Sequence, residues 1–282
     1  MRQFRQFVVA RTPEEATDLK SSIGPEAMYV AGGTGLVPFV KTPIEVLIDV
    51  SKLGFTGIVR GGNKTVIGAT TRIADLMAHE LRAVAPILCK AVRRLGTPLV
   101  RNAATVGGNL VYAFLPSDLT VGLLATGAGI QILGESSRTI QIEKLLDDGW
   151  LGGNDLISKI TLAKPDAGSG TGFAKFGRGE VDIGLVNAAV LLKAARGKVE
   201  DLRIAVGQSS TMPEFLRDAA QEVRGEKISR RLIDGVAGRA SESVRPRDDY
   251  RASAEYRKHL VRVMVGRALV EAASEAGVEI ED

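Results

Sequence analysis

The stretch Ala31-Gly32-Gly33-Thr34-Gly35 decides how this sequence is interpreted. It follows directly on residues 27–31, a short apolar segment typical of a buried strand, and residues 46–50 supply a second strand of the same kind. Because glycines have no Cβ atoms, the backbone N–H groups of such a turn can converge on an anion, which is the geometry a diphosphate needs. Thr34 adds a hydroxyl donor. Taken alone, the stretch also fits an ordinary turn at the end of a strand.

A second glycine pair, Thr105-Val106-Gly107-Gly108-Asn109, repeats this device with a hydroxyl before and an amide after the glycines. It lies in a predicted glycine-rich loop, residues 101–109, and two such loops can grip one dinucleotide. We expect both glycine pairs to line one cleft with their backbone N–H groups facing inward. Asp118, at the start of a predicted helix, can accept hydrogen bonds from a ribose or a ring N–H, although the helix dipole alone also favours a carboxylate there.

Composition is typical of a soluble globular protein. The chain has 282 residues, of which 45% are hydrophobic and 25% charged, and no apolar stretch approaches the length of a membrane span. Its net charge is +4, but Lys and Arg alternate with Asp and Glu, so nucleic-acid binding is not expected. One cysteine, Cys89, and two histidines, His79 and His259, predict neither a disulfide nor a metal centre. We expect a cytoplasmic protein.

The element pattern predicts an α+β fold. Thr12, Pro13 and Glu15 form a capping-box start for a helix that ends before Gly24. The sequence around Gly62 is expected to be a hairpin turn, because Asn63 stands where a phosphate loop needs glycine. Further strands are predicted at residues 57–60, 65–69, 130–133 and 155–162, and further helices at residues 71–79, 86–95 and 117–125.

A linker rich in Pro and small residues, residues 164–170, places the domain boundary at about residue 168. The first domain is then residues 1–168, with lobes of about 1–55 and 56–168, and the second is residues 169–282. The second domain is predicted to contain antiparallel strands followed by helices. Its strands are expected at residues 172–176, 185–194 and 199–206, and its helices at residues 214–224, 229–239 and 253–276.

Over nearly its whole length the chain resembles the FAD-binding, medium subunits of molybdenum hydroxylases, which include xanthine dehydrogenase, carbon monoxide dehydrogenase and aldehyde oxidoreductases. The matching segments are Ala31-Gly32-Gly33-Thr34 with Lys41, residues 101–109, Ser117-Asp118-Leu119, Leu123-Leu124-Ala125, Phe173-Ala174-Lys175-Phe176, Asp182-Ile183 and Tyr256-Arg257. The block that ends in Gly107-Gly108-Asn109, followed by Asp118, is the most specific of these.

The resemblance implies which residues bind FAD. Residues 30–36 would hold the pyrophosphate, the second glycine pair would line the cofactor, and Asp118 and Lys175 would contact the flavin or its sugar chain. A cation near the ring can stabilise the anionic reduced flavin, although Lys175 also fits a surface lysine on a strand. Leu95 and Ile157 match apolar cofactor contacts and would serve equally in the core. The implied cofactor-binding residues are Val30, Ala31, Gly32, Gly33, Thr34, Gly35, Leu36, Thr105, Gly107, Gly108, Asn109, Asp118, Ile157 and Lys175.

The resemblance also implies the architecture and the partners. It predicts a two-lobed FAD-binding domain of the vanillyl-alcohol-oxidase/PCMH-like type, followed by a smaller domain of antiparallel sheet and helices. Molybdopterin and 2Fe–2S clusters would lie on two partner subunits of a heterotrimer that dimerises. Electrons would pass through FAD to NAD, oxygen or a quinone, without a catalytic side chain or a metal site on this chain.

Three features depart from the family pattern. Gly35 stands where many relatives have an acidic residue or serine, residues 112–116 form a bulkier segment than usual, and Arg178 replaces a pair of arginines.

Two alternatives stay open: a flavin oxidoreductase that acts alone, and a non-catalytic assembly or nucleotide-sensing module of the same fold. Gly35 and Phe114 favour the second alternative.

Overall fold

The computed structural model describes residues 4–36, 44–111, 117–147, 151 and 153–282. The chain divides into two compact units whose sequence ranges interleave. The first unit is Met1–Asp75, Pro98–Tyr112 and Ala128–Ala163, and the second is Leu76–Thr97, Ala113–Gly127 and Lys164–Asp282. The contribution of the middle of the chain to the second unit was not predicted, and the domain boundary near residue 168 stays a prediction.

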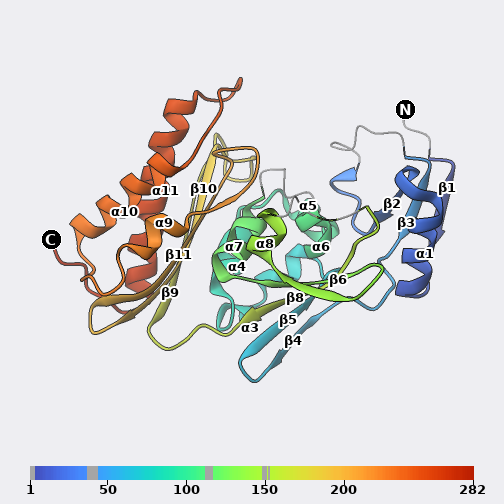
Figure 1. Ribbon diagram of the computed structural model, residues 1–282, viewed down its shortest axis with the longest axis horizontal. Coiled ribbons are helices and arrows are strands. Elements are labelled where there is room, and N and C mark those ends of the chain that lie inside the picture. Colours follow the sequence, from blue (N-terminus) through green and yellow to red (C-terminus); the bar gives the residue numbers. More distant parts are fainter. Residues whose placement is uncertain (1–3, 37–43, 112–116, 148–150, 152) are drawn as a thin grey trace. The chain divides into compact units, whose positions relative to one another are not determined.

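The first unit begins with a three-stranded parallel sheet in the order β1-β3-β2. Its strands are β1 (Gln6–Val9), β2 (Ala27–Val30) and β3 (Val46–Asp49). The helix α1 (Pro13–Ile23) packs on this sheet, and a short 3-10 turn, η1 (Gly24–Glu26), leads into β2 (Figure 1). As predicted, Thr12 caps α1 by accepting a hydrogen bond from the Glu15 N–H at 3.1 Å, and Gly24 follows with a positive φ.

The same unit contains a five-stranded sheet in the order β4-β5-β8-β6-β7, with all neighbours antiparallel. The predicted turn between the first two strands is confirmed: Gly61 pairs with Lys64, and Gly62 has φ +55°. The sequence did not predict β7 or the helix α8 (Ile142–Asp147) that follows it. The strands are β4 (Ile58–Gly61), β5 (Lys64–Gly68), β6 (Gly129–Leu133), β7 (Arg138–Gln141) and β8 (Leu156–Ala163).

Two segments of the first unit differ from their predicted form. Residues 101–109, expected to be a loop, lie largely in two short helices, α5 (Pro98–Ala103) and α6 (Val106–Val111). The expected helix at residues 71–79 is only a 3-10 turn, η2 (Ile73–Met77). The reason is tertiary, because the backbones of the two segments bond to each other: Ile73 N–H donates to the Ala104 carbonyl at 2.9 Å.

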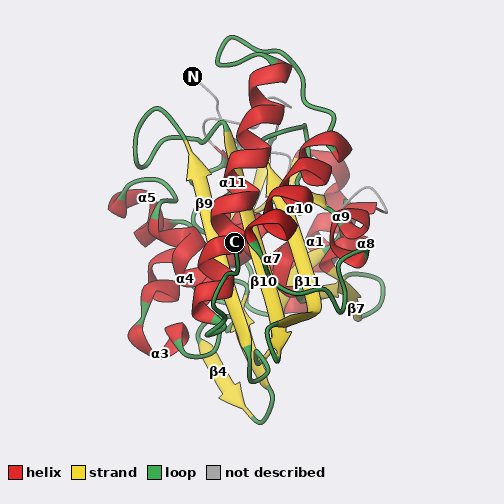
Figure 2. Ribbon diagram, turned by 90° about the vertical axis from the view of Figure 1, so that its left-hand side faces the viewer, coloured by secondary structure: helices red, strands yellow, loops and turns green. Residues whose placement is uncertain are grey.

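The second unit has a four-stranded antiparallel sheet in the order β12-β11-β10-β9. Helices α10 and α11 cover one face, and α4 and α7 pack against the other (Figures 1 and 2). The predicted helix at residues 214–224 is instead a strand, β12 (Glu214–Phe215), followed by the short helix α9 (Arg217–Gln221). The other elements are β9 (Ser169–Phe176), β10 (Val186–Ala195), β11 (Lys198–Gly207), α3 (His79–Arg82), α4 (Pro86–Arg93), α7 (Asp118–Thr126), α10 (Arg230–Ser243) and α11 (Ala254–Glu275).

The edge strand β9 is covered by α11 at unusually short range. A Cβ atom at Gly172 would overlap the Ala268 carbonyl, and one at Gly170 would overlap the Ala272 carbonyl, so only glycine allows this approach. Glu275 on the same helix accepts hydrogen bonds from the N–H and the hydroxyl of Thr171, each at 2.6 Å. These contacts occupy the exposed edge of the sheet.

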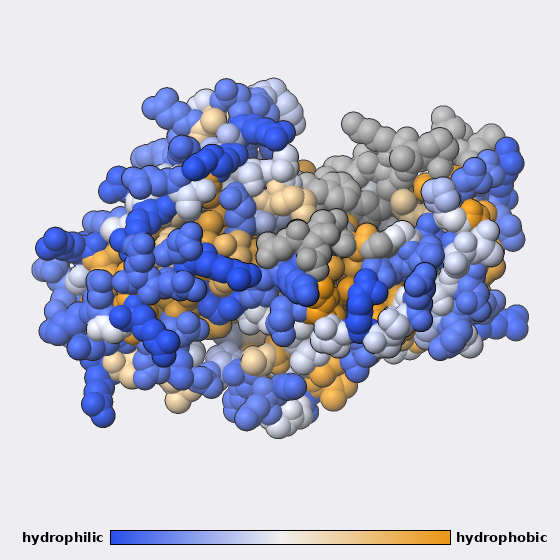
Figure 3. Space-filling view, viewed as in Figure 1, coloured by the Kyte–Doolittle hydropathy of each residue, from blue (hydrophilic) through white to orange (hydrophobic). Residues whose placement is uncertain are grey.

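The surface is mainly polar on the face drawn in Figure 3, where hydrophobic residues show in separate patches. Among the described residues, no helix combines the length and the apolar character that crossing a bilayer requires.

Candidate functional site

The first glycine turn has the form of an anion-binding backbone concavity. Gly33 lies in the left-handed region with φ +68°, and its carbonyl accepts the Leu36 N–H at 3.1 Å. In the part of the chain that the structure describes, the backbone N–H groups of residues 32–35 donate no hydrogen bond to the protein, and all four residues are half-buried. Consecutive free N–H groups around a left-handed residue form a site that suits a phosphate.

This turn lies directly against the segment that leads into the second glycine pair. A Cβ atom at Gly32 would overlap the Ala103 carbonyl and come within 3.0 Å of the Ala104 Cα. Two stretches about seventy residues apart in the sequence are therefore in backbone contact. That the two glycine pairs line one cleft stays a prediction. The contact also explains why residue 32 must be glycine.

The second glycine pair does not present its N–H groups to a ligand, so that prediction was wrong. Val106 N–H donates to the Thr71 carbonyl at 2.9 Å, and Gly107 N–H donates to the Ala69 carbonyl at 2.7 Å. The N–H groups of Gly108 and Asn109 donate to the hydroxyl and the carbonyl of Thr105, at 3.2 and 2.9 Å. The glycines lie in the first turn of α6, where the distant segment 69–71 satisfies the first N–H groups and Thr105 satisfies the next two.

In the second unit, the two predicted flavin contacts Asp118 and Lys175 bind each other. Lys175 Nζ lies 2.7 Å from Asp118 Oδ2 and also donates to the Arg94 carbonyl at 2.8 Å. The other carboxylate oxygen, Oδ1, accepts from Asn187 Nδ2 at 2.6 Å. The side chains of Asp118 and Lys175 are only 3% and 4% exposed. The pair joins the start of α7 to β9 and β10.

This pair is a buried ion pair. Burial raises the pKa of the Asp118 carboxyl, while the Lys175 ammonium and the Asn187 amide act in the opposite direction. Both carboxylate oxygens of Asp118 already accept hydrogen bonds from the protein. A direct contact of Asp118 or Lys175 with a flavin therefore stays a prediction.

The remaining predicted residues lie in or beside the cores. Ile157 is buried on β8, Leu95 is buried just after α4, and Leu36 is buried after the first turn. Val30 is half-buried at the end of β2. Lys41 and the segment 112–116, including Phe114, lie outside the described residues.

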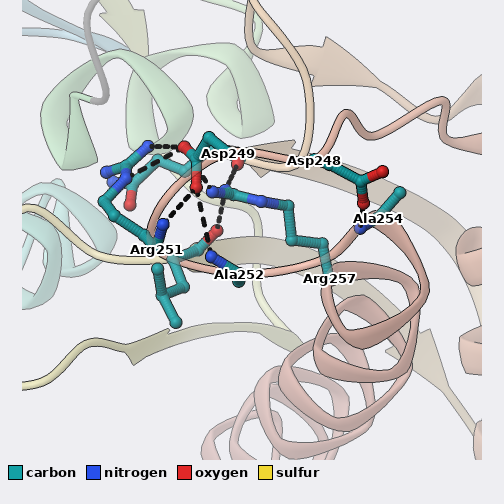
Figure 4. Close-up of polar contacts among 8 residues, drawn as sticks. Asp248, Asp249, Arg251, Ala252, Ala254 and Arg257 are labelled. Carbon is teal, nitrogen blue, oxygen red and sulfur yellow. Dashed lines mark hydrogen bonds and ion pairs between the residues drawn. The ribbon is translucent and has the colours of Figure 1, made fainter.

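Sequence reasoning gave no role to a buried arginine in the second unit. Arg257, only 2% exposed at the start of α11, donates through Nη1 to the carbonyls of Leu185 at 3.0 Å and Gln208 at 2.6 Å. Its Nη2 lies 2.7 Å from Asp249 Oδ2 (Figure 4). The sequence signal that could have identified it is an arginine on a largely apolar face of the last helix.

The carboxylate of Asp249 is fixed by the loop that precedes α11. It accepts hydrogen bonds from the backbone N–H groups of Arg251 and Ala252, at 2.8 and 3.1 Å, and from the Arg251 guanidinium (Figure 4). Desolvation opposes ionisation of Asp249, but these hydrogen bonds and the one from Arg257 outweigh it, so its pKa lies well below the ordinary value. The loop thus holds the Asp249 carboxylate beside the Arg257 guanidinium.

The described residues contain no group of three His, Cys, Asp or Glu side chains arranged to hold a metal ion.

Comparison with known proteins places the chain in one family. Residues 2–164 match the FAD binding domain in molybdopterin dehydrogenase, and residues 171–272 match the CO dehydrogenase flavoprotein C-terminal domain. The glyceraldehyde dehydrogenase medium chain of Sulfolobus acidocaldarius is 28% identical, over 86% of this chain and 90% of that protein. The carbon monoxide dehydrogenase medium chain of Afipia carboxidovorans is 27% identical, over 93% and 94%.

A solved structure agrees over the whole chain. Carbon monoxide dehydrogenase from Hydrogenophaga pseudoflava, in a form that lacks the Mo-pyranopterin moiety of the molybdenum cofactor, is similar with a TM-score of 0.92 at 26% identity, and covers 98% of this chain and 99% of that one. This confirms the predicted fold class, a PCMH-like FAD-binding domain followed by a domain of antiparallel sheet and helices. The chain therefore belongs to the FAD-binding flavoprotein subunits of the molybdenum hydroxylase family.

Proposed function

We propose that this protein takes electrons from iron–sulfur clusters on one partner subunit and passes them, through bound FAD, to a small-molecule acceptor such as NAD, oxygen or a quinone. A second partner would carry the molybdopterin that oxidises the substrate, and the heterotrimer would dimerise. Support comes from relatives that are themselves medium chains or medium subunits of dehydrogenases and hydroxylases. Bound FAD can accept electrons singly and release them in pairs.

The observation that carries the FAD-binding part of the proposal is the first glycine turn. Within the described part of the chain, the N–H groups of residues 32–35 have no protein partner, and Gly33 between them has a left-handed φ of +68°. A diphosphate is negatively charged, and its oxygens can accept hydrogen bonds from these N–H groups. The residues thus fit the pyrophosphate of FAD, with Thr34 as a further donor.

The other predicted contacts have different tasks in this proposal. Thr105, Gly107, Gly108 and Asn109 line the cofactor through side chains and Cα surfaces, since the N–H groups of Gly107, Gly108 and Asn109 are already bonded. Lys175 contacts the flavin with its ammonium, and Asp118 holds that ammonium in place. A fixed cation favours the anionic reduced ring over the neutral oxidised ring.

The test is FAD retention after purification, measured by the visible flavin absorbance of the chain. Gly33→Val should abolish retention, because a β-branched side chain is strained at a positive φ and would shift the backbone N–H groups of the turn that binds the phosphate. Gly54→Val is the matched control: Gly54 has φ +77° in the same unit and open space around its Cβ position. It carries the same strain and should retain FAD. Equal flavin content in the two variants would remove the support for this site.

A further inference from the structure

Gln208 combines two unfavourable features at one position of the second unit. Its φ is +68°, a left-handed conformation that is strained for a non-glycine residue. The residue is only 6% exposed, and neither the oxygen nor the nitrogen of its carboxamide has a hydrogen-bond partner among the described residues. Such strain and such unsatisfied groups persist only where neighbouring contacts impose them.

The contacts that hold Gln208 in this conformation are those of Arg257. Its Nη1 donates to the carbonyls of Gln208 and Leu185. Its Nη2 lies beside Asp249 Oδ2 (Figure 4). The end of β11 and the start of β10 are thereby fixed to one buried cation. The Gln208 backbone cannot relax to a right-handed conformation without losing this hydrogen bond.

Because the Gln208 backbone is fixed, its side chain lies beside the side chain of Lys175. A Cβ atom at Gly184 would lie 2.5 Å from Gln208 Oε1 and 3.2 Å from Lys175 Cε. Both side chains therefore pack on the same side of Gly184, beside each other. The Gln208 carboxamide occupies the space next to the aliphatic part of Lys175, whose ammonium is bound to Asp118.

We propose that Gln208 is a positioning residue for Lys175: its carboxamide, packed against Gly184 and fixed through Arg257, closes the space beside the lysine side chain and keeps the ammonium on Asp118. The importance of this for FAD rests on the proposed function, in which Lys175 contacts the flavin. The position of Lys175 itself does not rest on it. Gln208 thus lowers the stability of the unit in exchange for a fixed cation.

The first test needs no cofactor. Acylation of Lys175 by an amine-reactive ester, followed by peptide mass spectrometry, reports how often the buried ammonium becomes accessible. Gln208→Gly should raise the labelling rate of Lys175 by about tenfold. It should also keep or raise the midpoint of thermal unfolding, by about 2–4 °C, because glycine adopts this φ freely and removes the unsatisfied amide.

Arg196→Gly is the matched control. Arg196 is the other described non-glycine residue with a positive φ, +53°, in the exposed turn between β10 and β11. The same substitution should leave Lys175 labelling unchanged. Unchanged labelling in Gln208→Gly, or an equal rise in both variants, would overturn the proposal. If Gln208→Gly does not fold, Gln208→Asn replaces it, since Asn tolerates this φ and its shorter amide should also expose Lys175.

The second test measures FAD affinity by fluorescence titration of the whole chain. Gln208→Gly should weaken binding by about tenfold, and should add nothing in a Lys175→Gln background. An equal loss in both backgrounds would show that Gln208 does not act through Lys175, and would contradict the proposal. Absence of FAD binding in the unmodified chain would instead refute the proposed function, and the labelling result would still decide the role of Gln208.

Discussion

Gly32 lies against the carbonyl of Ala103 so closely that a Cβ atom at residue 32 would overlap it. The contact joins the turn that ends β2 to the helix α5, which leads into the second glycine pair. The two glycine motifs therefore have different roles in the first unit. The N–H groups of the first have no protein acceptor among the described residues, whereas Val106 and Gly107 of the second donate to the carbonyls of Thr71 and Ala69.

Gly32→Ala should destabilise the first unit by about 1–3 kcal/mol, because the added methyl group must displace backbone atoms. Urea unfolding measures the change. Gly61→Ala is the control, since a Cβ atom at Gly61 meets open space and its φ is not positive. A Gly32→Ala protein as stable as Gly61→Ala would show that the two segments are not in contact.

Gly172→Ala should destabilise the second unit by a similar amount, about 1–3 kcal/mol, because α11 would have to move away from β9. Gly238→Ala, within α10 and with nothing near its Cβ position, should instead stabilise by about 0.5–1 kcal/mol through helix propensity. Thermal unfolding of both variants gives the comparison. Changes of the same sign would contradict the described approach of α11 to β9.

Asp118→Asn should destabilise the chain by about 3–5 kcal/mol, because it leaves the Lys175 ammonium buried without its anion. The double variant Asp118→Asn with Lys175→Met should lose less than Asp118→Asn alone, since no unpaired charge is left. A double-mutant cycle by urea unfolding measures the coupling. Additive losses would mean that the two groups do not interact in solution.

Acid should weaken the attachment of α11 to β9 through Glu275. Desolvation of this carboxyl raises its pKa, but hydrogen bonds from Thr171 and Lys90 outweigh it, so the pKa in the folded state lies below the ordinary value. The stabilisation is therefore fully present above the unfolded-state pKa and is lost as the pH falls through the folded-state pKa. Glu275→Gln should reduce the loss of stability below about pH 4.5.

The control for this pH dependence is Glu279→Gln, at an exposed residue without a described partner. Its stability profile between pH 7 and pH 3 should match that of the unmodified chain. If Glu275→Gln also matches it, the Thr171 and Lys90 contacts contribute nothing to the stability of the folded state.

The sequence predicted elements whose signals are local. Thr12, Pro13 and Glu15 predicted the start of α1, and Gly62 with Asn63 predicted the hairpin turn. The strand β1 was missed because it is short, mostly exposed and paired with β3, about forty residues away. The segment 214–224 was taken for one helix because its pairing with β11 is not encoded in its own periodicity.

The candidate site was predicted only in part for the same reason. The glycine turn after β2 and its proximity to the second motif follow from local sequence and from the family resemblance. The hydrogen bond from the Gly107 N–H to the Ala69 carbonyl involves a segment distant in the sequence. The pairing of Asp118 with Lys175 likewise joins residues 57 positions apart. Asn187 inside an apolar run was a visible sign of a buried polar cluster.

Amide hydrogen exchange of the first unit, with and without FAD, tests the central claim most directly. The N–H groups of residues 32–35 have no acceptor in the part of the protein that the structure describes, so they should exchange rapidly in the free chain and become protected when FAD binds. Those of residues 106–109 are already bonded and should change little. Bound FAD that leaves the exchange of residues 32–35 unchanged would contradict the assignment of the pyrophosphate to this turn.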